Sequence, residues 1–203
     1  MAWRYCGARS TTKNRQSEVS SSLTSEVGYG LLEGRLYLPK LWFNPQCQQR
    51  REACHVPAEV AFATKVEIAL ELLRRQTERG IFHAQWVASD SFFGVDSAFR
   101  DQLVAAVGKS YLAAIKPKST VWIGKRALTV AEVAAEPSTR WQRAPLAEGD
   151  KGPIIAKVAA TRVCDKRNDK PGVKQWLILR RLEDGRLKYY LSNASARVAK
   201  STL

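Results

Sequence analysis

Asp90 is the residue of this sequence whose setting most suggests chemistry. It ends the short apolar run Trp86-Val-Ala-Ser and is followed by Ser-Phe-Phe-Gly94. An acidic residue at the carboxyl end of a buried strand is a common place for α/β enzymes to hold a metal ion or a substrate. The same residue types are also ordinary turn formers between a strand and a helix. Both interpretations stay open on Asp90 alone, because a catalytic assignment needs partner residues.

The segments that flank Asp90 predict alternating helices and strands. A helix should follow the capping-box sequence Thr64-Lys-Val-Glu67 and end at Gly80. An apolar run, a second helix and a second strand come next (residues 81–89, 99–107 and 111–115). This order favours right-handed crossovers between parallel strands, which would place Asp90 at their carboxyl edge.

The remainder of the chain divides into a polar start and a β-rich second half. Residues 10–26 are rich in Ser and Thr without helix or strand periodicity, so we expect a disordered tail there. The apolar pairs around Glu33-Gly34 predict two short strands joined by a tight turn. Beyond Lys116, four strand-like segments are expected to pair antiparallel, and Thr129-Val-Ala-Glu132 should open one short helix; the strand segments are residues 120–123, 154–163, 175–181 and 187–192.

Positive charge is concentrated in the second half of the chain. The net charge is +14, and residues 1–108 carry 13 Lys and Arg against 11 Asp and Glu, whereas residues 109–203 carry 20 against 8. Such an excess favours a polyanionic partner, most often nucleic acid, although a generally basic solvated surface is the alternative. No segment has the length of a membrane span or the pattern of a signal peptide, so we expect an intracellular protein. The four cysteines lack metal-binding spacing and should be reduced thiols.

The order of several sequence blocks resembles the DDE transposases of bacterial insertion sequences, which are DDE-superfamily endonucleases with an RNase H-like core. The two most specific blocks are Gly34-Arg-Leu-Tyr-Leu-Pro-Lys-Leu-Trp42 and Trp86-Val-Ala-Ser-Asp90-Ser-Phe-Phe-Gly94. Weaker blocks extend the resemblance over about residues 28–194; they are Val56–Lys65, Val66–Arg75, Lys151–Pro153, Trp176–Arg181 and Tyr189–Ala194.

The resemblance implies metal-dependent cleavage and transfer of DNA strands. In such enzymes three carboxylates bind Mg²⁺ or Mn²⁺, and Asp90 matches the second of them. The first should lie upstream of residue 1 and the last, a Glu, beyond Ala194. Asp96 is instead expected to cap a helix, and Glu183 and Asp184 to form a turn. We therefore expect a fragment truncated at both ends that is catalytically inactive alone.

The resemblance also implies a division of the chain into four parts. Residues 1–27 would be a disordered or frame-disturbed tail, and residues 28–116 a partial RNase H-like core. Residues 117–192 would be a basic, β-rich insertion, and residues 193–203 the truncated start of the C-terminal region. The fold class expected is α/β, with an incomplete core of parallel strand and helix units followed by an antiparallel insertion.

Double-stranded DNA is the partner that this interpretation implies. The expected location is the bacterial cytoplasm, at the nucleoid when the chain is bound to DNA. Self-association of the chain is a further option. The candidates for phosphate contacts are basic residues of the second half: Lys116, Lys118, Lys125, Arg126, Arg180, Arg181 and Lys188. Trp122, Trp141 and Trp176 lie in or beside apolar strands and should be core residues. Two other functions are open: a non-catalytic DNA-binding module, and a small metal-dependent nuclease.

Overall fold

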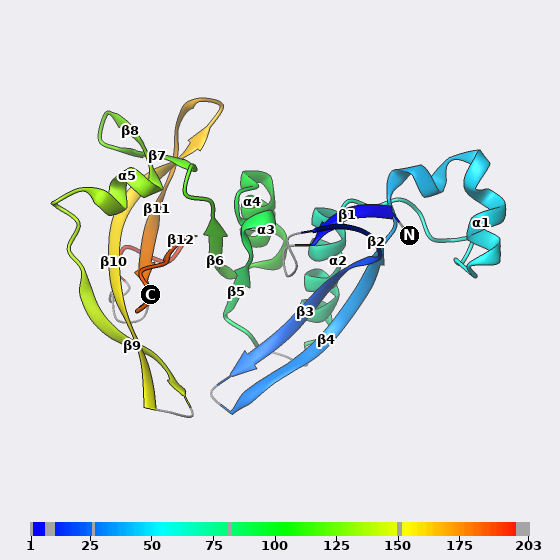
Figure 1. Cartoon of the computed structure of the whole chain (residues 1–203), viewed down its shortest axis with the longest axis horizontal. Coiled ribbons are helices and arrows are strands. Elements are labelled where there is room, and N and C mark those ends of the chain that lie inside the picture. The colour runs from blue at the N-terminus through cyan, green and yellow to red at the C-terminus, as the bar shows by residue number, and fades with distance from the viewer. Residues whose placement is uncertain (1, 7–10, 26, 81–82, 150–151, 198–203) are drawn as a thin grey trace. The chain divides into compact units, whose positions relative to one another are not determined.

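A boundary between Ala84 and Gln85 divides the chain into two compact units. The computed structural model describes residues 2–6, 11–25, 27–80, 83–149 and 152–197 (Figure 1). Some predicted features therefore lie outside the described residues: parts of the tail (1, 7–10 and 26), the start of the apolar run (81–82), Lys151, and residues 198–203. The boundary between the units differs from the one expected at residue 116.

The first unit begins with two antiparallel strand pairs. Strands β1 (Ala2–Cys6) and β2 (Thr11–Arg15) form one pair, and β3 (Ser17–Ser25) and β4 (Gly28–Tyr37) form the other. The disordered tail expected over residues 10–26 is thus replaced by paired strands: residues 11–15 form β2, and residues 17–25 form β3. The polar side chains of β3 do not prevent pairing, because β4 pairs with the backbone groups along one edge of β3 and Val19 is buried.

Strand β4 also corrects the tight turn predicted at Glu33-Gly34. The strand extends from Gly28 to Tyr37, because its partner is β3 and not its own second half. Its pairing has one irregularity, where Ser21 pairs with Glu33 but Ser22 pairs with Leu31. Two short 3₁₀ segments and one short helix then follow: η1 (Lys40–Phe43), η2 (Pro45–Cys47) and α1 (Gln48–Ala53).

Helix α2 (Lys65–Arg79) has the ends that its sequence predicts. The hydroxyl of Thr64 accepts a hydrogen bond from the amide of Glu67 (3.2 Å), and the Glu67 carboxylate accepts one from the amide of Thr64 (2.7 Å). Gly80 ends the helix in the left-handed conformation, with φ of 63°. The helix contacts β3 and β4 with Ile68 and Leu72 buried, and Arg75 forms an ion pair with Glu33 of β4.

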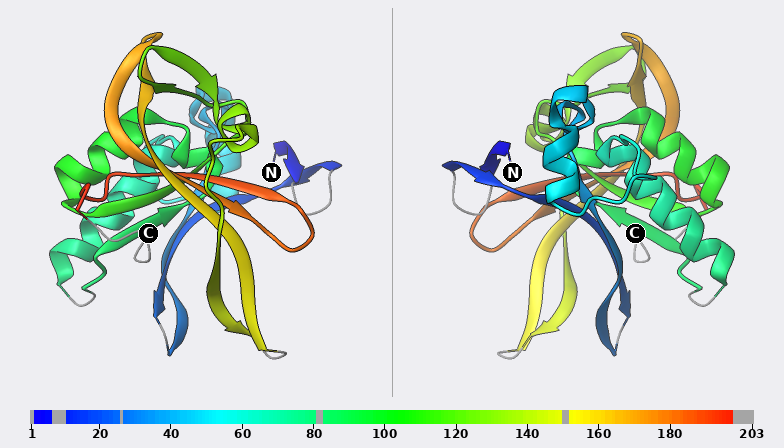
Figure 2. Two further views of the ribbon diagram at one scale, coloured as in Figure 1. Left: turned by 90° about the vertical axis from the view of Figure 1, so that its left-hand side faces the viewer. Right: turned by 90° about the vertical axis from the view of Figure 1, so that its right-hand side faces the viewer.

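The second unit is built on a mixed sheet. The spatial order is β5 (Trp86–Ser89), β6 (Ser110–Ile115), β12 (Leu187–Ser192), β11 (Lys170–Arg181), β10 (Gly152–Arg167), β7 (Thr120–Ile123) and β8 (Arg126–Thr129), and β9 (Gln142–Gly149) pairs with β10. Strands β5 and β6 are parallel and every other pairing is antiparallel. The α/β class with parallel strands followed by an antiparallel region is therefore confirmed. Strands β10 and β11 are long and strongly twisted (Figure 2).

Three helices accompany this sheet: α3 (Ser91–Gly94), α4 (Ser97–Val107) and α5 (Val130–Ala135). The predicted capping box at Thr129 and Glu132 opens α5, and Asp96 caps α4 as expected. Phe99 and Leu103 of α4 are buried, as are Leu177 and Leu179 of β11. Because β6 pairs with β12, residues on both sides of position 116 share one sheet. No helix in the described part of the chain is long and apolar enough to cross a membrane.

Candidate active site at the end of strand β5

Asp90 lies directly after β5 and caps helix α3. Its Oδ1 atom accepts hydrogen bonds from the amides of Phe92 (2.8 Å) and Phe93 (3.3 Å). The side chain is exposed, and its Oδ2 atom makes no hydrogen bond to any described residue. The turn interpretation of Asp90 is therefore confirmed, and one carboxylate oxygen remains for a ligand.

The parallel register of β5 and β6 places Asp90 where the sequence predicts. Ser89 pairs with Ala113, so Asp90 follows at the carboxyl end of this parallel pair. Gly94 then holds α3 against β6, because a Cβ atom at this position would overlap the carbonyl oxygen of Ala114. The glycine of the Trp86–Gly94 block is thus required by close backbone packing.

A buried ion pair is hydrogen-bonded to the C-terminal end of α3. Arg100 of α4 donates one hydrogen bond from Nη1 to the carbonyl of Gly94 (2.6 Å) and another from Nη2 to Asp165 of β10 (2.7 Å). The side chains of Arg100 and Asp165 are only 4% and 2% exposed. Asp165 also accepts hydrogen bonds from Arg167 and from the amide of Val173, each 2.8 Å long. These contacts give the buried carboxylate the partners that its burial requires.

Arg167 extends this network to the surface. It binds the carboxylate of Asp101 through both terminal nitrogens, and its hydrogen bond holds the pKa of Asp101 below the usual range. Tyr111 of β6 donates a hydrogen bond to Gln175 (2.8 Å), and burial raises the pKa of its hydroxyl. Sequence reasoning missed the whole network, since 65 positions separate Arg100 from Asp165 and no local pattern links them.

The described residues do not complete a metal-binding cluster around Asp90. Within them, no group of three or more His, Cys, Asp or Glu side chains could hold a metal ion. Asp96 caps α4, and Asp184 lies beside the β11–β12 turn in an ion pair with Arg186 (2.5 Å). Asp90 is therefore the one acid of this region that the strand geometry favours, and a metal pair does not fit the described residues alone.

The predicted phosphate contacts do not form a single patch. Arg180 pairs with Lys188 across β11 and β12, so the next residue, Arg181, lies on the opposite face of the sheet. Arg126 forms an ion pair with Glu136 (2.8 Å). The other candidates lie exposed in the loops before β7 and between β7 and β8; they are Lys116, Lys118 and Lys125.

The three tryptophans predicted as core residues differ in burial. Trp176 is buried and donates a hydrogen bond from Nε1 to the carbonyl of Ser195 (3.2 Å). Trp122 and Trp141 are only partly buried. The guanidinium of Arg181 lies over the ring of Trp141, 4.5 Å from the ring centroid.

A comparison with protein families gives one match. A family model described as DDE superfamily endonuclease matches residues 1–170. No curated protein and no solved structure matches the chain. The matched residues include all of the first unit and, in the second, Asp90, Gly94, Arg100 and Asp165.

Proposed function

This chain belongs to the DDE superfamily endonucleases, and we propose that it is part of a transposase that cuts and rejoins DNA strands during transposition. Membership of an endonuclease family implies a DNA substrate, and the superfamily generally uses divalent metal ions. The observation that supports the proposal is the position of Asp90. It is an exposed carboxylate with one free oxygen at the carboxyl end of a parallel strand pair.

In this proposal Asp90 is one ligand of a divalent metal site. Carboxylate oxygens are the preferred ligands of Mg²⁺ and Mn²⁺. The described residues do not place two further carboxylates beside Asp90 to complete a group of three. We therefore propose that the chain acts as a fragment and that its partner carboxylates come from additional polypeptide. When bound, the metal would supply activation of a nucleophile and stabilisation of the leaving oxygen.

The DNA that surrounds the coding segment provides the first test. The proposal expects an Asp-bearing strand to be encoded upstream and a Glu-bearing helix downstream, in the same or a shifted reading frame. The same inspection tests the frame-disturbance hypothesis for residues 10–26, which stays a prediction. If neither flank encodes such an element in any frame, the origin from a transposase is wrong.

The extended polypeptide then allows a biochemical test. We expect it to nick supercoiled plasmid in Mn²⁺ and to lose this activity in the Asp90→Asn variant. Asp96→Asn is the matched control, because Asp96 caps α4 in the same way that Asp90 caps α3. Equal activity of the Asp90→Asn variant and the unsubstituted protein would overturn the assignment of Asp90.

A non-catalytic DNA-binding module is the second candidate function. It is favoured by the use of Asp90 as a helix cap and by the excess of basic residues after residue 108. The two functions differ in the extended polypeptide. A binding module would hold DNA without nicking it, whatever metal is supplied. For either function we propose a location with the bacterial chromosome.

A further inference from the structure

Three basic residues form a row across β9, β10 and β11. Arg143 pairs with Lys157, and Lys157 pairs with Arg181, in the antiparallel register of these strands. Directly opposed residues share one face of a sheet, with Cβ atoms about 5 Å apart. The cation row, as we name Arg143, Lys157 and Arg181, therefore spans about 10 Å across the sheet.

The charge of the cation row is not neutralised by ion pairs. Within the described residues, none of its three side chains forms a salt bridge with an Asp or Glu. Like charges directly opposite one another destabilise a strand pair. The row therefore weakens the isolated sheet, and an anionic ligand would relieve the repulsion.

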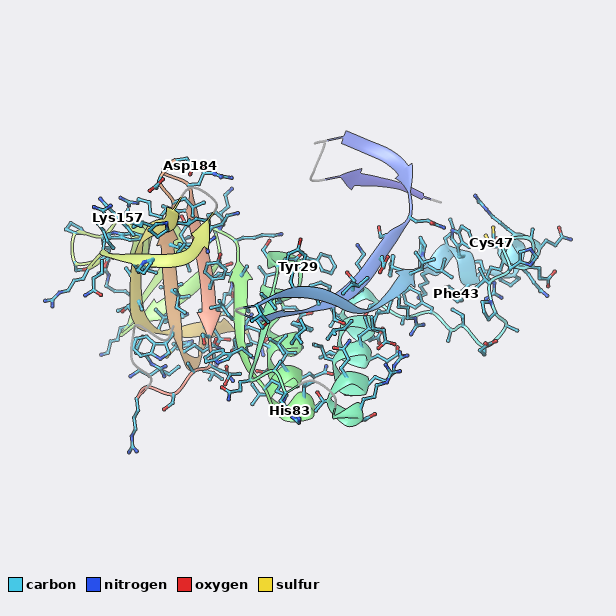
Figure 3. All side chains as sticks on the ribbon, turned by 90° about the horizontal axis from the view of Figure 1, so that it is seen from below. Tyr29, Phe43, Cys47, His83, Lys157 and Asp184 are labelled. Atoms are coloured by element: carbon cyan, nitrogen blue, oxygen red, sulfur yellow. The ribbon has the colours of Figure 1, made fainter. Side chains whose placement is uncertain are left out.

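The surroundings of the cation row suit a ligand that approaches from solvent. The row lines a hollow of about 220 Å³, in which Glu183 is the one acidic residue and the rest of the lining is Ile155, Ala156, Leu182 and Gly185. Arg143 and Lys157 are exposed, and Lys157 is labelled at the same end of the sheet as the β11–β12 turn that carries Asp184 (Figure 3). Stacking on Trp141 fixes the plane of the Arg181 guanidinium.

We propose that the cation row binds phosphates of duplex DNA, an inference that rests on the proposed function and adds a binding surface to it. Duplex DNA carries about one negative charge per 1.7 Å of its axis, so a row of about 10 Å meets several phosphates. An arginine can bind a phosphate through two parallel hydrogen bonds, and a lysine acts as a point charge beside it. Of the three residues, only Arg181 was a candidate from the sequence.

The test compares two double variants with the same change in net charge. Arg143→Gln with Lys157→Gln removes two charges of the cation row. Lys170→Gln with Lys174→Gln removes two exposed lysine charges from the opposite end of β11. The affinity of the full chain for a short duplex of random sequence is measured by fluorescence anisotropy over a series of NaCl concentrations.

We expect the row variant to lose at least about tenfold in affinity, and the slope of log K against log salt to become shallower by about 2. The control variant should change far less. The row variant should also unfold at the same temperature as the unsubstituted chain or above it, because a like-charge pair has been removed. If it unfolds at a lower temperature, the single exposed variant Lys157→Gln is used, with an expected change in slope of about 1.

Each alternative result has a distinct meaning. Equal losses in the two double variants would show a general attraction to net charge and overturn the cation row, while the DNA partner of the proposed function would stand. A larger loss in the control variant would instead place the DNA-binding surface at the other end of β11 and overturn the cation row. Failure of the unsubstituted chain to bind duplex DNA even at low salt would overturn both the row and the DNA partner. Binding to anionic vesicles but not to duplex DNA would assign the row to a membrane surface and contradict the proposal.

Discussion

At the scale of single residues, Asp90 shows how a structural and a chemical role can share one carboxylate. Its Oδ1 atom satisfies two amides at the start of α3, while Oδ2 is left without a hydrogen bond from the described residues. Asn can satisfy the same amides but lacks the negative charge with which a carboxylate attracts a divalent cation. Substitution by Asn therefore separates the two roles.

We predict that Asp90→Asn leaves stability nearly unchanged, whereas Asp90→Ala lowers the free energy of unfolding by about 1 kcal/mol through loss of the cap. In NMR spectra of the unsubstituted chain, Mn²⁺ should broaden the backbone amide signals around residues 88–94. Both variants should abolish this broadening. In the controls, Asp96→Asn and Asp96→Ala, the stability pattern should repeat and the broadening around Asp90 should remain. Broadening that survives in Asp90→Ala would remove Asp90 from the metal site.

At the scale of elements, the buried ion pair between α4 and β10 is linked to helix α3, which Asp90 caps. Arg100 reaches both the carbonyl of Gly94 at the end of α3 and the carboxylate of Asp165. The pair is buried, so each charge depends on the other for its solvation.

We predict that Asp165→Asn lowers the free energy of unfolding by about 3–5 kcal/mol, because it leaves the Arg100 guanidinium buried without a counter-charge. The double variant Arg100→Met with Asp165→Leu should lose much less, since no unpaired charge remains. Urea denaturation of the three proteins measures both effects. If Asp165→Asn is at least as stable as the double variant, the buried charge of Arg100 does not depend on Asp165.

The outer part of this network predicts a dependence on pH. The pKa of Asp101 in the folded chain is lowered, chiefly by the hydrogen bond from Arg167. A carboxyl group with a lowered pKa stabilises the fold above its unfolded pKa of about 4, and this contribution is lost as the pH falls through the folded value. The melting temperature should therefore fall on acidification below about pH 5, and less steeply in Asp101→Asn. Identical profiles of the two proteins would show that the Asp101–Arg167 contact does not contribute.

At the scale of the whole molecule, family membership and charge both indicate DNA, but the described residues do not assemble the carboxylates required for the chemistry. The second unit holds Asp90 and most of the basic excess, with 21 Lys and Arg against 11 Asp and Glu over residues 85–203. A single carboxylate supplies too little charge and too few ligands to hold two metal ions in a reactive pair.

We predict that the purified chain alone neither nicks nor joins DNA in Mg²⁺ or Mn²⁺. Supercoiled plasmid incubated with the chain should stay supercoiled over a range of metal concentrations. Nicking that depends on metal and disappears in Asp90→Ala but not in Asp96→Ala would instead establish a small metal-dependent nuclease.

The sequence by itself determined the features that depend on neighbours a few positions away. The capping boxes at Thr64 and Thr129 and the ends of α2 arise from hydrogen bonds within one helical turn, so residue types at fixed spacing are enough to predict them. The same holds for Asp90, whose place after an apolar strand and before a helix is local. The resemblance carried by the two specific blocks was sufficient to predict the family that the comparison then matched.

The tertiary structure alone decided which distant segments meet. The polar residues 17–25 form a strand because β4 is their hydrogen-bonding partner. The composition of this segment does not indicate that partner. Arg100 and Asp165 join across 65 positions, and the cation row exists only because the register of three strands aligns Arg143, Lys157 and Arg181. A shift of one residue in either pairing would move a side chain to the other face. Pairing register between strands is a property of the assembled sheet, which is why the cation row could not be predicted from the order of residues.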